Sequence, residues 1–159
     1  MVTPIPASGV PHDTGPPIEI LQVTPSESEY GSLRAALHHP RWSLNRVMSC
    51  EGAREFLRQR TVAVVVCAAD LADGGWKDLL CEIAGLAQPP RLVVSSRLAD
   101  IHLWAEVLNL GGYDVLDAPF AAEEVVGVIS AAWRSWKSAG NRSPAWRAPA
   151  GAFGASTAA

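Results

Sequence analysis

The sequence predicts an α/β fold in which a five-stranded parallel sheet is covered by helices on both faces. Short apolar stretches alternate with stretches of about ten to fifteen residues that have helical periodicity. Two of the apolar stretches, 61–67 and 91–95, are hydrophobic at almost every position, as strands are when helices cover both faces of their sheet. Proline or glycine stands at several of the junctions and marks the turns between elements.

Composition indicates one globular domain. The chain has 159 residues, of which 48% are hydrophobic and 18% charged, enough for a domain with its own core. The formal net charge of -3 gives no reason to expect a nucleic-acid partner. No apolar run reaches the roughly 18 residues of a membrane span, and 1–17 lacks the basic start and apolar core of a signal peptide. We therefore expect a cytoplasmic protein that does not bind a membrane.

The chain carries three cysteines, Cys50, Cys67 and Cys81. Their spacing matches no zinc-binding pattern, and the four histidines are scattered. We expect reduced thiols and no metal ion, with Cys67 and Cys81 acting as small core residues.

Both ends of the chain differ in composition from its middle. Residues 1–17 and 138–159 are rich in small residues and proline and show almost no apolar periodicity. These two segments are predicted to be flexible tails. The ordered domain is therefore expected to span 18–137.

The first half of this domain is predicted to form two strand–helix units. The apolar stretch 18–23 is a strand, and 26–38 is a helix with acidic residues near its start, where they complement the helix dipole. A second strand is expected at 42–48. The short helix 51–60 follows it.

The middle of the domain repeats the same alternation. The β-branched stretch 61–67 is the strand that the pattern indicates most clearly, because it is apolar on both faces. A helix is expected over 75–86, where large apolar residues recur at helical spacing. The next buried strand is 91–95.

The last part of the domain adds a helix, a strand and a helix. The helix 98–110 is closed by Gly111-Gly112, the residues that favour a helix C-cap. A short strand follows at 113–117. The final helix, 121–137, carries an apolar side formed by Val125, Ile129, Trp133 and Trp136.

This element order predicts where a binding site would lie. Alternating strands and helices imply right-handed crossovers and a parallel sheet, and five strands fit the doubly wound, flavodoxin-like order. In such sheets the binding crevice lies at the carboxyl ends of the strands. Here those ends follow Val23, Cys67, Val94 and Leu116.

Three motifs in the second half resemble those of response-regulator receiver domains of the CheY-like type. The pair Asp73-Gly74 followed by Leu79-Leu80 resembles the loop and helix after the family's third strand. The stretch 93–96 resembles its strand ending in a Thr or Ser hydroxyl. The stretch 116–120, Leu-Asp-Ala-Pro-Phe, resembles its Leu-Thr-Lys-Pro-Phe signature with the lysine replaced. The resemblance covers the region 18–137.

The resemblance implies a site of phosphorylation from which most of the chemistry is missing. In the family an aspartate attacks a phosphoryl group, an acidic pair holds magnesium, and a lysine and a hydroxyl bind the phosphate. Here Ala68 stands at the aspartate position, Thr24 and Pro25 at the acidic pair, Ala118 at the lysine and Ser95 at the hydroxyl. We therefore expect no catalytic residue, no metal and no cofactor.

The resemblance also implies a surface for protein partners, because receivers use their fourth helix, fifth strand and fifth helix for contacts. Four residues map there: Trp104, Val115, Trp133 and Trp136. Tryptophan is enriched in interface hot spots, although burial in the core would explain Trp136 equally simply and is the favoured interpretation for Trp133. The sequence predicts a pseudo-receiver, not an enzyme, that works without phosphorylation in two-component phosphorelay signalling. Its partner would be a histidine kinase, another regulator or a second copy in a homodimer.

Two other functions stay open. In one, Asp70 is a displaced phosphate acceptor and Ser95 its switch hydroxyl, although Asp70 also suits a turn. In the other, the domain binds a small molecule or is an enzyme, with the loop 24–28 and Cys67 at its crevice. A helix cap is the simpler role for Ser26 in that loop.

Overall fold

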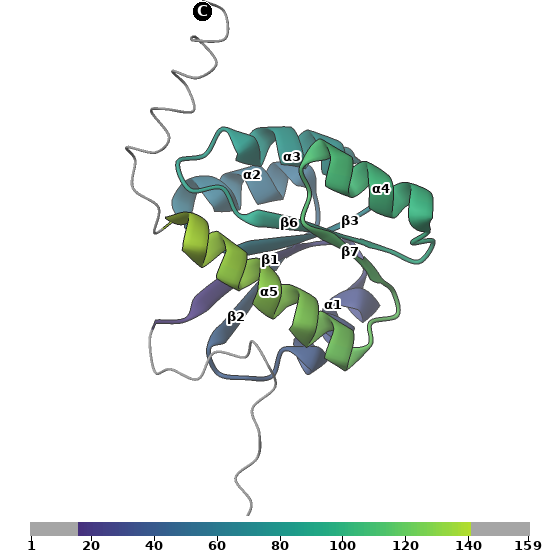
Figure 1. Ribbon diagram of the computed structural model, residues 1–159, viewed down its shortest axis with the longest axis horizontal. Coiled ribbons are helices and arrows are strands. Elements are labelled where there is room, and N and C mark those ends of the chain that lie inside the picture. The colour runs from purple at the N-terminus through teal and green to yellow at the C-terminus, as the bar shows by residue number, and fades with distance from the viewer. Residues whose placement is uncertain (1–15, 141–159) are drawn as a thin grey trace, which may run out of the picture.

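The computed structural model describes residues 16–140, which form a three-layer α/β fold (Figure 1). The middle layer is a parallel sheet with the strand order β2-β1-β3-β6-β7. Its strands are β1 (Ile18–Val23), β2 (Trp42–Val47), β3 (Val64–Ala68), β6 (Arg91–Ser96) and β7 (Asp114–Asp117). This is the flavodoxin-like order, so the predicted fold class is confirmed.

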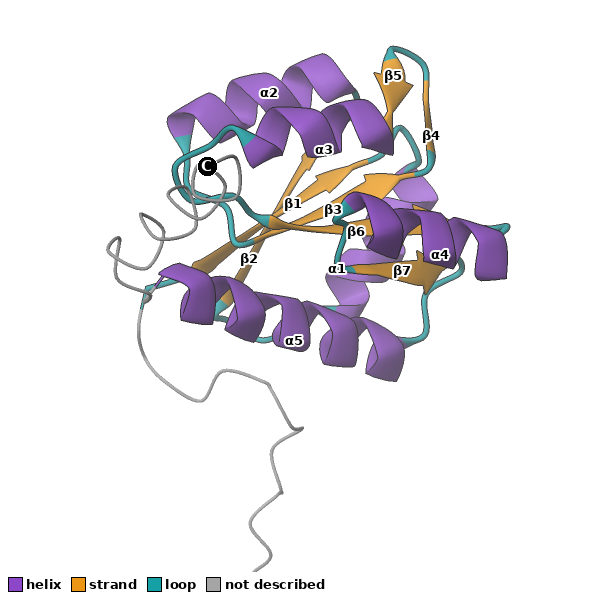
Figure 2. Ribbon diagram, turned by 45° about the horizontal axis from the view of Figure 1, so that its top comes forward, coloured by secondary structure: helices purple, strands orange, loops and turns teal. Residues whose placement is uncertain are grey.

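Helices cover both faces of the sheet (Figure 2). One face carries α1 (Glu27–Ala36) and α5 (Ala122–Gly140), and the other carries α2 (Cys50–Gln59), α3 (Trp76–Ala84) and α4 (Ile101–Leu110). Each predicted helix is present, with ends that differ by a few residues. Among residues 16–140, no helix is long and apolar enough to cross a bilayer.

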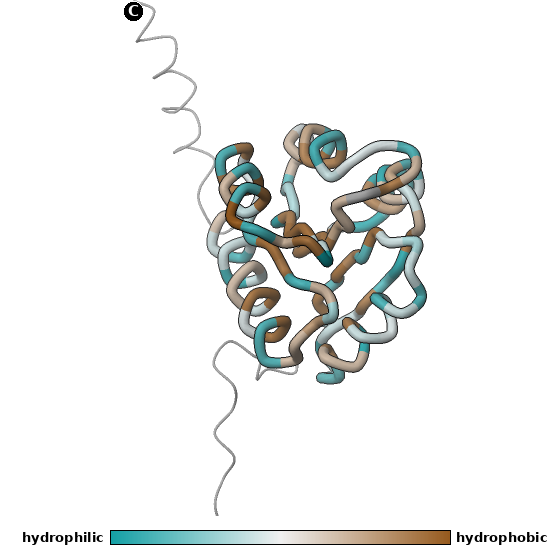
Figure 3. Tube along the Cα trace, turned by 90° about the vertical axis from the view of Figure 1, so that its right-hand side faces the viewer, coloured by the Kyte–Doolittle hydropathy of each residue, from teal (hydrophilic) through white to brown (hydrophobic). Residues whose placement is uncertain are grey.

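The sheet separates two hydrophobic cores, and its central strand contributes to both. In β3, Val64 and Val66 pack with Leu33 and Ile129 in the core beneath α1 and α5. The alternate residue Val65 packs in the core beneath α2, α3 and α4. Figure 3 shows these strands as hydrophobic segments in the interior of the molecule. Burial on both faces explains why the stretch predicted as the central strand is apolar at consecutive positions.

Local hydrogen bonds determine where the helices begin and end. The side chains of Ser26, Ser49 and Asp100 each accept a hydrogen bond from a backbone N–H in the first turn of the following helix. The cap at Asp100 places the start of α4 at Ile101, three residues after the predicted start. Gly111 ends α4 with a φ of 104°, a left-handed conformation that favours glycine.

Two features differ from the sequence-based expectation. A short antiparallel pair joins β4 (Asp70–Leu71) to β5 (Gly74–Gly75) between β3 and α3, where no strand was predicted. Residues 138–140, assigned from sequence to the C-terminal tail, continue α5. The remaining parts of the two predicted tails, 1–15 and 141–159, lie outside the described residues.

Asp73 ties this β4–β5 hairpin to α2. Its two carboxylate oxygens accept hydrogen bonds from the backbone N–H groups of Cys50 and Glu51, at 3.0 and 3.1 Å. These bonds from the start of a helix lower the pKa of Asp73, because they stabilise its charged form. The same hairpin follows the carboxyl end of β3, so Asp73 helps to position the edge of the sheet where a site is expected.

We predict that Asp73→Asn weakens the protein at neutral pH and reduces the dependence of its stability on acid pH. Because the pKa of Asp73 is lowered on folding, its contribution is complete above the unfolded pKa of about 3.9 and is lost as the pH falls through the lower folded value. Urea denaturation between neutral and acid pH measures this. Glu124→Gln, on an exposed part of α5, is the control, and equal pH profiles for the two variants would contradict the prediction.

Candidate functional site

A pocket of about 440 Å³ opens at the carboxyl edge of the sheet, where the sequence predicts the site. Its wall includes Thr24 and Pro25 from the β1–α1 loop, Ala68 from the end of β3 and Ser95 from β6. The structure therefore brings four of the five predicted positions together. The fifth, Ala118, is buried beside the end of β6, where its backbone N–H donates to Ser96 O at 3.0 Å.

The register of the parallel strands produces this arrangement. Ala68 lies opposite Ser95 in the β3–β6 pairing, and the N–H of Ala69 donates to Ser95 O at 2.9 Å. The Ser95 side chain is buried, and its hydroxyl has no hydrogen-bond partner within the described residues. Because a buried hydroxyl without a partner is costly, Ser95 is suited to bond to a group that enters the pocket. Its register partner on the neighbouring strand is Ala68, which has only a methyl side chain.

Glu29 also lines this pocket, whereas the sequence predicted it only as an acidic residue near the start of a helix. Its Oε1 accepts a hydrogen bond from the Thr24 hydroxyl at 3.4 Å, and its Oε2 lies 3.8 Å from the Arg97 guanidinium. Its own backbone N–H bonds to Ser26 Oγ. The Ser-x-x-Glu spacing of Ser26 and Glu29 is a helix-capping signature that would have placed Glu29 at the start of α1. Glu29 is the single carboxylate in the described wall of the pocket.

Arg46 holds the β1–α1 loop from the neighbouring strand β2. Its guanidinium donates to the backbone oxygens of Thr24 at 3.1 Å and Pro25 at 3.0 Å, and it pairs with Glu27 at 3.2 Å. The Arg46 side chain is only 15% exposed. Three interactions from one guanidinium restrict the movement of this loop. Glu27 therefore points to Arg46 and is absent from the described pocket wall.

Asp70, the predicted substitute acceptor, lies at the start of the β4–β5 hairpin. Asp70 follows Ala68 by two residues, and its backbone pairs with that of Gly75. Its side chain lies outside the described part of the structure. Its role as an acceptor stays a prediction.

The thiols differ in their accessibility. Cys67 is buried, and burial raises its pKa far above the usual range of a thiol, which disfavours a nucleophilic thiolate. Burial, followed by the nearby Asp73 carboxylate, also raises the pKa of Cys50. Cys81 is exposed, so its predicted place in the core is wrong. It lies two residues after Leu79, on the opposite side of α3.

Residues 16–140 contain no group of three or more side chains arranged to hold a metal ion. In the pocket, the carboxylate of Glu29 is shared between Thr24 and Arg97. Glu29 is thus the one carboxylate that the described wall offers to a metal ion, and it already has two partners.

The four residues predicted at an interface lie in different environments. Trp104 on α4 is 47% exposed. Val115 is partly buried against the core beneath α2, α3 and α4. Trp133 and Trp136 on α5 are partly buried against the other core, and the Trp133 ring meets Trp42 edge to face at 6.2 Å. Trp104 belongs to an exposed apolar row with three other residues, Leu98, Ile101 and Leu108.

Comparison with solved structures identifies the fold. The signal receiver domain of an HD domain-containing protein from Pseudomonas fluorescens Pf-5 matches with a TM-score of 0.73 and 23% identity, over 82% of this chain and 97% of that one. The beryllofluoride-activated NtrC4 receiver domain dimer gives 0.68 and 19%, over 74% and 98%. A response regulator from Thermotoga maritima gives 0.67 and 16%, over 74% and 98%.

No family model matches the sequence, and no curated protein matches it either. The likeness is therefore one of structure, and it extends over nearly the whole length of the matched receiver domains. The protein has the fold of response-regulator receiver domains.

Proposed function

We propose that this protein is a pseudo-receiver, which takes part in two-component signalling by binding another protein and is not itself phosphorylated. One observation carries the proposal. At the carboxyl end of β3, where a receiver would present its acceptor to the switch hydroxyl, Ala68 is the register partner of Ser95, and both residues line the pocket.

The chemistry of phosphoryl transfer supports this proposal. Transfer depends on a positioned nucleophile and on cations that neutralise the charge that develops on the phosphoryl oxygens. In the described pocket wall, Thr24 and Pro25 offer no carboxylate for magnesium, and Ala68 offers no nucleophile. Arg97 lines the pocket, and its guanidinium lies 3.8 Å from the Glu29 carboxylate, which offsets its charge. An arrangement of this kind suits a permanent contact surface better than a reaction centre, so we do not assign an enzymatic activity.

Two groups of contacts hold the loops around the pocket in one conformation. Arg46 fixes the β1–α1 loop through two backbone oxygens, and hydrogen bonds of a charged donor contribute about 1.5–3 kcal/mol each. The Glu29–Arg97 pair links α1 to the β6–α4 loop at 3.8 Å. Because Arg97 is largely exposed, that ion pair adds less than about 1 kcal/mol. Such a pocket would need no phosphate to hold its loops.

The exposed apolar row on α4 and on the turn before it is the surface we assign to the partner. It consists of Ile101, Trp104 and Leu108 on α4 and of Leu98 in the preceding turn. Apolar side chains that lie together on a surface favour burial against another protein. The partner would be a histidine kinase, another regulator or a second copy of this chain. The NtrC4 receiver with a similar fold is described as a dimer, which makes a homodimer a reasonable form to test.

A second function is favoured by Ser95. Its buried hydroxyl has no hydrogen-bond partner among the described residues, as a switch hydroxyl waiting for a phosphoryl group would have. In that case Asp70, on the hairpin that follows β3, would be the acceptor.

Amide NMR spectra with and without magnesium and beryllofluoride distinguish the two functions. Beryllofluoride mimics an aspartyl phosphate, and we expect no shifts at Ser95 or Thr24, because the described wall of the pocket contains no aspartate. Shifts at these residues that disappear in Asp70→Asn would contradict the pseudo-receiver and support the displaced acceptor. Ser95→Ala is the matched control, since it removes the hydroxyl and keeps the strand.

Tryptophan substitutions test the assignment of the partner surface. Trp104→Ala should change the free energy of unfolding by less than about 1 kcal/mol, because about half of its side chain is in solvent and it belongs to neither core. Trp133→Ala should cost about 3 kcal/mol, because it removes core packing and the contact with Trp42. Urea denaturation measures both.

The same variants separate binding from stability. In sedimentation equilibrium of the purified protein, we expect self-association that Trp104→Ala weakens at least about tenfold, the loss of a typical hot spot. His102→Ala, an exposed neighbour on α4, is the control. Self-association that is unchanged in Trp104→Ala would contradict the assignment of this surface.

A further inference from the structure

The pocket at the carboxyl edge of the sheet contains a buried polar group that lacks a partner. Ser95 lines this pocket, and the residue is only 2% exposed. Its hydroxyl makes no hydrogen bond within residues 16–140. Because an unpaired hydroxyl in the interior is unfavourable, the pocket is suited to a ligand that forms a hydrogen bond with Ser95.

The Glu29 carboxylate in the same pocket has its partners at long distances. The hydrogen bond from the Thr24 hydroxyl measures 3.4 Å, and the Arg97 guanidinium lies 3.8 Å away, beyond the range of a hydrogen bond. The Glu29 side chain is 16% exposed, whereas that of Arg97 is 69% exposed. Solvent and salt screen an exposed charge more than a buried one, so the negative charge of Glu29 dominates inside the described pocket. A cationic ligand is therefore favoured over an anion.

A primary ammonium group matches the acceptors of this wall. It carries three N–H donors and no acceptor, as the lysine side chain does. The wall offers the Glu29 carboxylate and the unpaired oxygen of Ser95. The Thr24 hydroxyl oxygen accepts a hydrogen bond from the Ser26 N–H at 3.1 Å and, with two lone pairs, can accept another. The number of acceptors thus equals the number of donors, and the bond to the carboxylate is of the strong, charge-assisted kind.

The remaining wall suits a short hydrocarbon body. It includes the apolar side chains of Pro25, Ala68, Ala69 and Leu98. The volume of about 440 Å³ is in the range of small-molecule sites, which combine apolar surface with a few polar groups. A ligand with one ammonium group and a few carbon atoms satisfies both parts of the wall.

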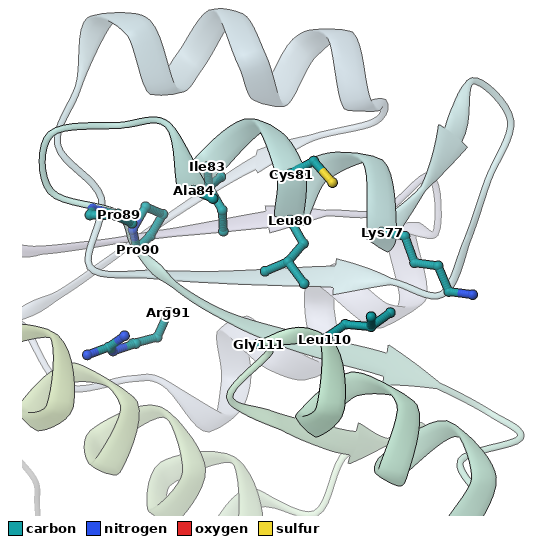
Figure 4. Close-up of a pocket in the computed structure, with 10 residues that line it drawn as sticks. All are labelled: Lys77, Leu80, Cys81, Ile83, Ala84, Pro89, Pro90, Arg91, Leu110 and Gly111. Carbon is teal, nitrogen blue, oxygen red and sulfur yellow. The ribbon is translucent and has the colours of Figure 1, made fainter. Parts of the chain in front are cut away.

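Another pocket of comparable size within the described residues has its charged groups engaged elsewhere. It lies between α3, the amino end of β6 and the end of α4, and has a volume of about 430 Å³ (Figure 4). The Lys77 ammonium on its rim pairs with Glu106 at 2.6 Å. The Arg91 side chain extends away from the pocket and donates to the backbone oxygen of Ser135 at 3.3 Å. The pocket at the carboxyl edge is therefore the better candidate for a charged ligand.

We propose that the pocket at the carboxyl edge binds a small primary alkylammonium ligand, whose charged group bonds to Glu29, Thr24 and Ser95. This ligand site goes beyond the contact role proposed above. Leu98 belongs both to the wall of the pocket and to the exposed apolar row assigned to the partner. A ligand bound here therefore lies beside the surface that the partner would cover.

Amide NMR of the full-length protein at pH 7 tests this site with three probes of similar size. The probes are n-butylammonium, neutral n-butanol and the anion n-butyrate, all at one ionic strength. A primary amine is protonated at this pH. We expect saturable shifts for butylammonium at Thr24, Glu29 and Ser95. Its dissociation constant should be at least about tenfold below that of butanol, the difference that one charge-assisted hydrogen bond makes.

Substitution of the carboxylate separates its charge from the shape of the pocket. Glu29→Gln should weaken butylammonium binding at least about tenfold and leave butanol binding unchanged, because the amide keeps the size of the side chain and removes its charge. Glu123→Gln is the matched control, since Glu123 is also an acidic residue in the first turn of a helix but is exposed on α5. Ser95→Ala should weaken butylammonium binding about three- to tenfold, as the loss of one hydrogen bond does.

Equal affinities for butylammonium and butanol would overturn the proposal. Tighter binding of butyrate would also overturn it, because the pocket would then be an anion site. Equal losses in Glu29→Gln and Glu123→Gln would contradict it as well, since they would indicate a general attraction to acidic residues on the surface. None of these outcomes bears on the pseudo-receiver, whose test is the response to beryllofluoride.

Discussion

The parallel register of β1, β3 and β6 is the constraint on which the rest of the structure depends. It places Val23 opposite Cys67 and Ala68 opposite Ser95, so the residues that end the strands meet at one edge. Burial of β3 on both faces makes a shift of this register costly, because a shift of one residue would exchange the side chains that face the two cores. The geometry of the candidate site thus follows from packing in the interior. It does not depend on charged or reactive side chains at the edge of the sheet.

Because the fold depends on packing in the interior, it is compatible with small, uncharged side chains at the edge of the sheet. The cores that maintain the sheet lie beneath the helices, while Thr24, Ala68 and Ser95 lie at the edge. Replacing an acidic side chain there with a small one removes charge repulsion and leaves the interior unchanged. Arg46 and the Glu29–Arg97 pair then connect the loops around the pocket. The proposed role as a contact surface needs only this stable arrangement of strands, helices and loops.

The sequence predicts the fold well, because strands buried on both faces and helices with one apolar side leave clear patterns. The strand 91–95 and the helix cap at Gly111 are examples. The β4–β5 hairpin was missed because strands of two residues have no periodicity. Cys81 was misplaced because apolar neighbours were considered without the position on the helix. Arg46 could not be predicted as a clamp, since its contacts join separate strands and loops.

Incubation with magnesium and acetyl phosphate, followed by intact-protein mass spectrometry, tests the central claim most directly. Acetyl phosphate can supply a phosphoryl group to a receiver aspartate without a kinase, so the experiment examines the chemistry of the pocket alone. With Ala68 at the end of β3, the account predicts an unchanged mass. A protein that gains a base-labile phosphoryl group, as an acyl phosphate would be, would contradict the account.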